Sequence, residues 1–304
     1  MSVVNVRHLV KIYSSFELNN VSFSVNAGRI TGFIGRNGAG KTTTIKSMIG
    51  LIHPNDGEIE YFGMPFTGNE NEIKKRIGYS TGTIGWYPRK KICDIVNIIR
   101  RFYETWDDSE YRKYLELFDL DENKAPVELS EGMKVKLNLL LALSHRAEVL
   151  ILDEPSSGLD PRARVEMKEL LKNLHSMGKT IIISSHILSE LSEMCNSIGI
   201  MNRGQLITAG KIEDVMQHFG GGQKLHIRVI SEMEPAVRLL QEQAGVTVQS
   251  VRENEILVGY QGTEEQIGRL LQYMIQNQVI MTDFYREAGT LESLFMQLTG
   301  GGAQ

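Results

Sequence analysis

The distribution of apolar and polar side chains divides most of the chain into short segments of two kinds. Short runs of apolar or β-branched residues alternate with stretches in which apolar residues recur every three or four positions. The first pattern is typical of buried strands, and the second is typical of helices that bury one face. Their alternation predicts an α/β fold. The expected strands are residues 3–7, 21–25, 29–35, 58–62, 77–79, 149–154, 179–186 and 197–201, and the expected helices are 42–49, 70–76, 134–145, 161–177, 187–195 and 211–219.

Residues 92 to about 146 depart from this alternation, because helical spacing continues there without an intervening strand. Two separate apolar helix faces are predicted in this stretch. They are formed by Ile95, Ile98, Ile99 and Phe102 and by Tyr111, Tyr114, Leu115 and Phe118. We therefore expect a helical subdomain, at about residues 85–146, inserted between two halves of the α/β domain.

Three consecutive glycines at 220–222 predict a linker between two domains. We expect the first domain to cover residues 1–219. Residues 223–304 would then form a small C-terminal α/β domain that ends in a frayed tail. Its expected strands are 225–230, 246–251, 256–260 and 279–284, and its expected helices are 234–243, 264–276 and 291–298.

Composition excludes several classes of protein. Of the 304 residues 41% are hydrophobic and 23% are charged, and the net charge is −4. There is no basic stripe, so nucleic acid is not an expected partner. No apolar run approaches the roughly 18 residues that a membrane span needs, and residues 1–10 lack the apolar core of a signal peptide. Cys93 and Cys195 stand alone, as reduced cytosolic cysteines do. We expect a cytoplasmic protein whose membrane role is peripheral.

A glycine-rich segment at the end of the expected strand 29–35 fits the phosphate-binding pattern G-x-x-x-x-G-K-[ST]. Glycines let the backbone curl closely around a phosphate chain, and the N-terminus of the following helix favours an anion. Lys41 can reach the terminal phosphates, and the Thr42 hydroxyl can ligate Mg²⁺. The alternative, a plain glycine turn, is disfavoured because a strand precedes the segment and a helix follows it. The expected nucleotide-binding residues are Gly35, Arg36, Asn37, Gly38, Ala39, Gly40, Lys41, Thr42 and Thr43.

Two further expected strands end in polar side chains. Asp153 and Glu154 follow one apolar run, and His186 follows another. Ligands of α/β folds bind at the carboxyl ends of the parallel strands, so we expect these three side chains near the phosphate-binding loop. The alternative for His186 is a structural role. Tyr13 lies in a polar connection between two expected strands, where it either packs half-buried or stacks on adenine.

Together these segments resemble the ATP-binding cassette (ABC) ATPases over residues 1 to about 215. The resemblance implies a P-loop NTPase core of the ABC type with a helical insertion, and it implies hydrolysis of ATP. The matching segments are residues 35–43 for the Walker A motif, 149–153 for Walker B, 129–133 (LSEGM) for the signature motif and 157–160 for the D-loop, which ends at Asp160.

The resemblance also implies roles for the residues at the nucleotide. Glu154 would be the catalytic base that polarises the attacking water, and His186 would contact the γ-phosphate. Asp153 and Thr42 would hold Mg²⁺, and Tyr13 would stack on adenine. These roles suit phosphoryl transfer, which depends on positioning and charge neutralisation more than on covalent chemistry.

Partners are implied by the same resemblance. Ser130 and Gly132 of the signature motif would contact the ATP bound by a second chain. Two ATPase subunits, identical or paralogous, would therefore enclose two ATP molecules head to tail. Because the chain has no membrane segment, integral permease subunits would be separate proteins, and this chain would sit peripherally on the inner face of the cell membrane.

Two positions depart from the family pattern. The usual signature LSGGQ is LSEGM here, but Ser130 and Gly132 remain, so we expect its function to survive. The family usually has Gln at the position of Gly82, and glycine offers no side chain to Mg²⁺ or to a partner. We therefore expect slow basal hydrolysis, with stimulation when a permease docks against residues 83–88, where Trp86 and Tyr87 offer an apolar anchor.

The expected function is that of the ATP-hydrolysing nucleotide-binding subunit of an ABC transporter, driving export through separate permeases. The C-terminal domain, with its segment 290–295, resembles the tails of bacterial ATPases that serve ABC-2-type exporters, in particular antibiotic-responsive ones. The alternatives are a soluble cassette ATPase associated with nucleic acid or ribosomes, and a non-hydrolysing regulatory module that binds ATP. A simple P-loop kinase would not explain residues 129–133 and 157–160.

Overall fold

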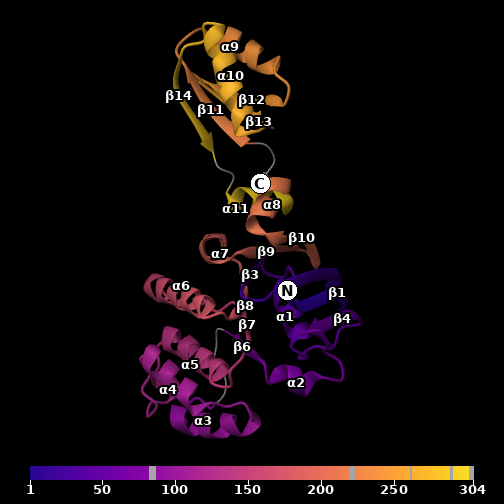
Figure 1. The fold of residues 1–304 in the computed structure, drawn as a ribbon, viewed down its shortest axis with the longest axis vertical. Helices are drawn as coiled ribbons and strands as arrows, with labels where there is room; N and C mark the ends of the chain where they lie inside the picture. The colour runs from indigo at the N-terminus through magenta and orange to yellow at the C-terminus, as the bar shows by residue number, and fades with distance from the viewer. Residues whose placement is uncertain (82–86, 220–222, 261, 288–289, 301–304) are drawn as a thin grey trace. The chain divides into compact units, whose positions relative to one another are not determined.

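The chain forms two compact units, Met1–Ile212 and Glu213–Gln304 (Figure 1). The sequence placed the boundary at the glycine run, whereas the contacts group the helix at 212–219 with the second unit. No helix in the described part of the chain is long and apolar enough to cross a membrane. The computed structural model describes residues 1–81, 87–219, 223–260, 262–287 and 290–300.

An antiparallel sheet of order β2-β1-β4-β5 begins the first unit. Its first two strands are longer than expected, because their pairing continues through polar residues as far as Ile12 and Glu17. One face is buried: in β2, Leu18, Val21 and Val25 are fully enclosed, while their neighbours face solvent. The strands are β1 (Ser2–Ile12), β2 (Glu17–Asn26), β4 (Asp56–Tyr61) and β5 (Met64–Pro65).

A second sheet, of order β10-β9-β3-β8-β7-β6, forms the centre of the first unit. All its strands are parallel except β10, which a turn at Arg203 and Gly204 returns antiparallel to β9. The parallel arrangement brings the carboxyl ends of β3, β7 and β8 to one edge, where α/β folds bind ligands. The strands are β3 (Ile30–Ile34), β6 (Ile77–Thr81), β7 (Val149–Asp153), β8 (Thr180–Ser185), β9 (Ser197–Asn202) and β10 (Gln205–Lys211).

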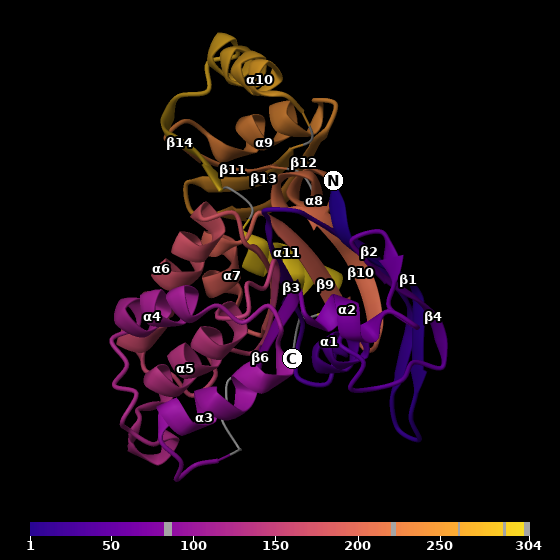
Figure 2. The same ribbon diagram turned by 60° about the horizontal axis from the view of Figure 1, so that its bottom comes forward.

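Both faces of this parallel sheet are covered (Figure 2). On one side α1 and the antiparallel sheet close a core that includes Phe33, Ile151 and Ile182. On the other side α5, α6 and α7 pack against β6, β8 and β3. The helices are α1 (Lys41–Met48), α2 (Glu70–Lys74), α5 (Glu131–Leu143), α6 (Pro161–Ser176) and α7 (Leu188–Met194).

The helical insertion contains α3 (Ile92–Ile99), a 3₁₀ turn (Arg100–Phe102), α4 (Asp108–Leu117) and a second 3₁₀ turn (Pro126–Glu128) before α5. Tyr111, Tyr114 and Phe118 are buried, which confirms one predicted face. The other prediction was wrong at Phe102, whose exposed fraction is 77%. The α-helix stops at Ile99, and the tighter 3₁₀ turn that follows rotates Phe102 away from the face.

The second unit combines a four-stranded antiparallel sheet, of order β12-β13-β11-β14, with α9 and α10 on one face (Figure 1). This is the split β-α-β-β-α-β arrangement. Its core joins both helices to the sheet through residues such as Leu240, Met274 and Ile227. The expected strand 279–284 begins later, because Val279 closes α10 by donating its N–H to Met274. The elements are α8 (Ile212–Phe219), β11 (Gln223–Val229), α9 (Met233–Gln241), β12 (Val246–Arg252), β13 (Glu255–Tyr260), α10 (Glu264–Gln276), β14 (Met281–Glu287) and α11 (Leu291–Leu298).

Candidate functional site

The glycine-rich loop connects β3 to α1. Gly40 has a φ of 110°, which a residue with a side chain rarely adopts, and it precedes α1 directly. A Cβ at Gly35 would come within 2.7 Å of the Met201 carbonyl oxygen. Both glycines are therefore required by the backbone path. Lys41, the first residue of α1, is only 5% exposed, and its Nζ donates to the Gly35 carbonyl over 2.8 Å.

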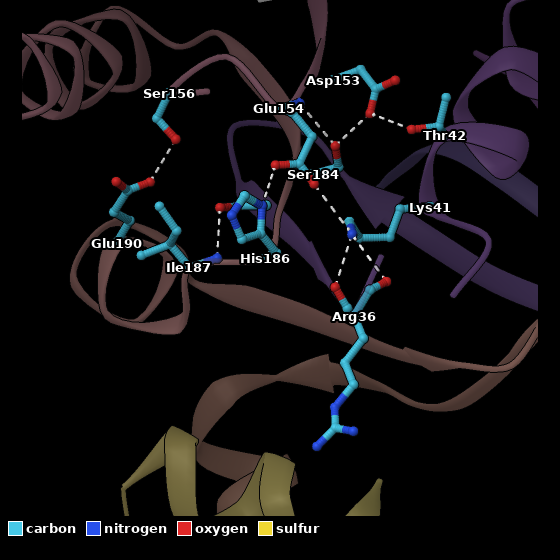
Figure 3. Close-up of polar contacts among 12 residues, drawn as sticks. Arg36, Lys41, Thr42, Asp153, Glu154, Ser156, Ser184, His186, Ile187 and Glu190 are labelled. Atoms are coloured by element: carbon cyan, nitrogen blue, oxygen red, sulfur yellow. Dashed lines mark hydrogen bonds and ion pairs between the residues drawn. The ribbon is translucent and has the colours of Figure 1, made fainter. Parts of the chain in front are cut away.

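A cavity of about 700 Å³ opens beside this loop. Its volume lies within the range of small-molecule binding sites. Gly35 and Arg36 are not on its wall, but their carbonyl oxygens contact Lys41, and the Arg36 side chain points away from that lysine (Figure 3). The cavity is lined by Ser15, Phe16, Asn37, Gly38, Ala39, Gly40, Lys41, Thr42, Thr43, Glu154, Ser157 and His186.

Asp153, at the end of β7, is held by two hydroxyl groups. Thr42 Oγ1 donates to Asp153 Oδ1 over 3.1 Å, and Ser184 Oγ donates to the same oxygen over 2.6 Å (Figure 3). Ser184 lies near the end of β8 and is fully buried. On the neighbouring strand β6, burial and the Asp153 carboxylate raise the pKa of Tyr79 to about 12, so its phenol stays neutral. The carboxylate of Asp153 is therefore fixed beside the first turn of α1.

Glu154, the next residue, has a left-handed backbone with a φ of 50°. Its N–H donates to Ser184 Oγ over 3.0 Å, so Ser184 fixes both acidic residues. The Glu154 carboxylate lies 3.2 Å from Lys41 Nζ through Oε1 and 2.7 Å from His186 Nδ1 through Oε2 (Figure 3). Glu154 thus joins the phosphate-binding loop to the end of β8. A non-glycine residue in this conformation is uncommon and such strain gathers at functional sites.

The residues after Glu154 are held by α7. Ser156 Oγ donates to Glu190 Oε2 over 2.7 Å (Figure 3). Arg164 Nε lies 3.8 Å from Glu190 Oε1. Asp160 caps α6 by accepting the Ala163 N–H over 2.8 Å. The loop from β7 to α6 is therefore fixed at both ends.

Ser130 caps α5, and its Oγ accepts the Met133 N–H over 3.2 Å. Ser130, Gly132 and Asp160 line a separate cavity of about 160 Å³ between α5 and α6. None of the three is on the wall of the larger cavity. Within one chain, the segment 129–133 is therefore apart from the phosphate-binding loop.

Comparison with known proteins gives a consistent result. Residues 18–157 match the family described as ABC transporter. The bacitracin transport ATP-binding protein BcrA of Bacillus licheniformis is 33% identical, over 99% of this chain and 98% of its own. The linearmycin resistance ATP-binding protein LnrL of Bacillus subtilis (strain 168) is 30% identical, over 93% of each chain. A solved structure of an ATP-binding subunit of an ABC transporter is 29% identical with a TM-score of 0.65, over 72% of this chain and 93% of that one.

The chain belongs to the ABC transporter family. It is an ATP-binding subunit with ATPase function, and its fold is that of an ABC ATPase cassette, as the sequence predicted. This membership favours the transporter subunit over a nucleic-acid or ribosome-associated ATPase and over a non-hydrolysing module. As a transporter ATP-binding subunit it has membrane permease partners.

The aromatic side chain on the cavity wall of this ABC subunit is Phe16 rather than Tyr13. Tyr13 is 42% exposed, its ring lies 5.4 Å from Lys11 Nζ, and its centroid is 6.4 Å from that of Phe16. Sequence reasoning missed Phe16 and also Ser184. The available signals were a second aromatic residue three positions after Tyr13 and the pair of serines that ends the apolar run of β8.

The departure at Gly82 lies outside the described residues, as does Trp86. Tyr87 is described: it has a φ of 49° and is 44% exposed. The expectation of slow basal hydrolysis with stimulation by a permease therefore remains a prediction.

Proposed function

We propose that this ABC subunit hydrolyses Mg²⁺-ATP at the cavity beside α1 and thereby drives export through separate permeases. The observation that carries the proposal is the convergence of Lys41, Thr42, Asp153, Glu154 and His186 at one sheet edge. The names of the relatives, a bacitracin transport protein and a linearmycin resistance protein, support export of an antimicrobial or similar amphiphilic compound.

The Asp153 carboxylate and Thr42 hydroxyl fit Mg²⁺, because hard oxygen ligands suit this ion and it is usually bound by one or two carboxylates together with substrate phosphates. Among the described residues no cluster of three or more His, Cys, Asp or Glu could hold a metal. That agrees with a cation shared between protein and nucleotide. When bound, Mg²⁺ would neutralise charge on the phosphates.

Lys41 and Glu154 neutralise each other across 3.2 Å. The triphosphate would draw the Lys41 ammonium towards its own oxygens, since it carries more negative charge than one carboxylate. Glu154 would then be free to accept a hydrogen bond from the attacking water, as a general base does. His186 would keep its hydrogen bond to Glu154 Oε2, and so hold that carboxylate in position. Asn37, Gly38 and Thr43 would line the phosphate chain.

We infer that two ATPase subunits complete each site head to tail. Ser130 and Gly132 line a cavity apart from the nucleotide cavity, which leaves them available to the ATP of a second chain. Asp160 lies beside them, at the end of the loop that begins at Glu154. The subunit would work in the cytoplasm, bound peripherally to integral permease subunits at the inner face of the cell membrane.

The test is ATP turnover by the purified chain with and without Mg²⁺, in the wild type and in Glu154→Gln. Loss of a general base typically costs about 10²–10⁴-fold in rate. We expect that loss in kcat while ATP still binds, because the amide keeps the shape of the side chain. Glu169→Gln, on the exposed surface of α6, is the control and should behave as wild type. Equal turnover in Glu154→Gln and wild type would contradict the proposal.

A further inference from the structure

The segment that leads from β8 into α7 contacts the loop between β7 and α6 at two points (Figure 3). His186 Nδ1 lies 2.7 Å from Glu154 Oε2. Four residues later, Glu190 Oε2 accepts the Ser156 hydroxyl over 2.7 Å. The first contact involves the proposed general base, whereas the residues of the second lie off the wall of the nucleotide cavity. The second contact therefore has no direct part in holding ATP.

The other oxygen of the Glu190 carboxylate faces α6. Arg164 Nε lies 3.8 Å from Glu190 Oε1 and donates to the Leu159 carbonyl over 3.0 Å. Glu190 Oε1 is buried and, within the described part of the chain, accepts no hydrogen bond. A buried carboxylate oxygen without a hydrogen bond costs free energy, so stability alone does not explain this glutamate. Glu190 and Arg164 together hold the loop at Ser156 and at Leu159.

The loop begins at a strained residue. Glu154 has a φ of 50°, and such a backbone at a non-glycine residue persists only where the surroundings impose it. Its N–H donates to Ser184 Oγ over 3.0 Å, and its carbonyl accepts the Ser157 N–H over 3.0 Å. Ser157 directly follows Ser156, so the second of these contacts depends on where Ser156 is held. The Glu154 conformation therefore depends on the contact between Ser156 and Glu190.

A neighbouring ion pair shows that Glu190 is not needed merely to join α6 to α7. Three residues further along α7, Glu193 pairs with Lys168 of α6 on the exposed surface, and none of its described contacts is with the loop. By contrast, Ser156 is buried, so its hydroxyl needs an acceptor within the protein. Its hydrogen bond to the Glu190 carboxylate is of the strong, charge-assisted kind.

We propose that Glu190 is a positioning residue for ATP hydrolysis. By holding Ser156, it keeps the strained backbone of Glu154 in place and directs that carboxylate at the attacking water. ATP binding does not depend on it, because the phosphate-binding loop holds the triphosphate. The inference rests on the proposed role of Glu154 as general base.

The test compares Glu190→Ala with Glu193→Ala in the full chain, with turnover measured well below the Tm of each variant. We expect Glu190→Ala to lower kcat about tenfold or more, because a small displacement of a catalytic group is costly. The Kd of ATP, measured by calorimetry, should stay within about twofold of wild type. Glu193→Ala should keep the wild-type kcat, since an exposed ion pair contributes little.

A double-mutant cycle assigns the effect to the contact with the loop. Ser156→Ala should lower kcat about as much as Glu190→Ala, and the double variant should be no slower than the slower single variant, because both substitutions remove one interaction. The proposal is overturned by an unchanged kcat in Glu190→Ala, by equal losses in Glu190→Ala and Glu193→Ala, or by losses that multiply in the double variant.

Amide hydrogen exchange tests the positioning without turnover. The N–H groups of Ser157 and Leu159 donate to carbonyls within the loop. In Glu190→Ala they should exchange about fivefold faster or more, while amides in the middle of α6 exchange as in wild type and Glu193→Ala changes neither. Absence of turnover in the wild type would refute the proposed function. Normal wild-type turnover, with unchanged exchange in Glu190→Ala, would refute the role of Glu190 alone.

Discussion

The two units arrange their polar side chains in opposite ways. In the first unit, neighbouring parallel strands deliver Asp153, Glu154 and Ser184 to one edge of the sheet, beside Lys41. In the second unit the strands are antiparallel, and their polar side chains alternate along the strands over one face. There His226 Nδ1 lies 2.9 Å from Glu255 Oε1, and its ring stacks on Tyr285 with centroids 4.4 Å apart.

The difference has a physical cause. Cross-strand neighbours in an antiparallel sheet lie close enough to satisfy each other, and the hydrogen bond to His226 lowers the pKa of Glu255. At the edge of a parallel sheet, polar groups from several strand ends crowd around one space instead. They are partly satisfied by each other and remain open to a ligand. We therefore expect catalysis to be concentrated in the first unit.

The largest effect on ATP binding should come from Lys41. Lys41→Met removes the cation while keeping most of the chain length, and it leaves Glu154 without its ion-pair partner. Removing one member of a buried charged pair typically costs 2–5 kcal/mol, or about 30-fold or more in affinity. ATP binding, measured by calorimetry, should weaken at least that much. Lys46→Met, on the same helix but off the cavity wall, should bind ATP normally. A comparable loss of ATP affinity in this variant would mean that the effect comes from disruption of α1 and not from removal of the Lys41 charge.

A smaller effect is expected from Ser184→Ala. It deletes the 2.6 Å hydrogen bond to Asp153 and one of the two acceptors for the Glu154 N–H. A hydrogen bond to a charged group contributes about 1.5–3 kcal/mol, which is on the order of tenfold or more. The Mg²⁺ concentration that gives half-maximal turnover should rise accordingly. Ser185→Ala is the matched control, because Ser185 Oγ accepts from the Ile187 N–H and does not contact Asp153.

The sequence predicts those parts of the site whose residues lie close together along the chain, and it misses contacts between residues far apart in sequence. The phosphate-binding loop is predicted because Gly35, Gly40 and Lys41 are set by spacing within one turn. Asp153 and His186 are predicted because apolar runs mark where their strands end. Ser184 is not, since its partner Asp153 is 31 positions away and the contact depends on β7 and β8 being neighbours. Sequence periodicity does not give strand order.

The fold shows the same limit. Helices and strands were mostly placed within a few residues, because each has its own periodic signal. Phe102 was misplaced because nothing in the spacing signals the change from an α-helix to a 3₁₀ turn. The grouping of α8 with the second unit follows from tertiary contacts, whereas the glycine run is only a local signal.

A further prediction concerns the aromatic wall of the nucleotide cavity. Stacking of a base on an aromatic ring is worth about 1–3 kcal/mol in nucleic-acid proteins. Phe16 lines the cavity, and Tyr13 lies beside it, 6.4 Å between ring centroids. If adenine stacks on Phe16, Phe16→Ala should weaken ATP binding about five-fold or more and Tyr13→Ala should weaken it less. The reverse order would restore Tyr13 as the stacking residue and require the loop between β1 and β2 to move.

The smallest expected effect on ATP binding comes from removing the second unit altogether. Every residue that lines the nucleotide cavity lies before position 187, and the first unit has its own core. Chains ending at Ile212 and at Phe219 should therefore bind ATP within about twofold of the full chain, as binding energy comes from the residues in contact. The two truncated chains also test where the boundary between the first and second units lies. If α8 belongs with the second unit, it loses its packing in the longer truncation, and that chain should show the lower Tm or aggregate more readily. Loss of ATP binding in both truncations, with native circular dichroism retained, would show that the second unit contributes to the nucleotide site.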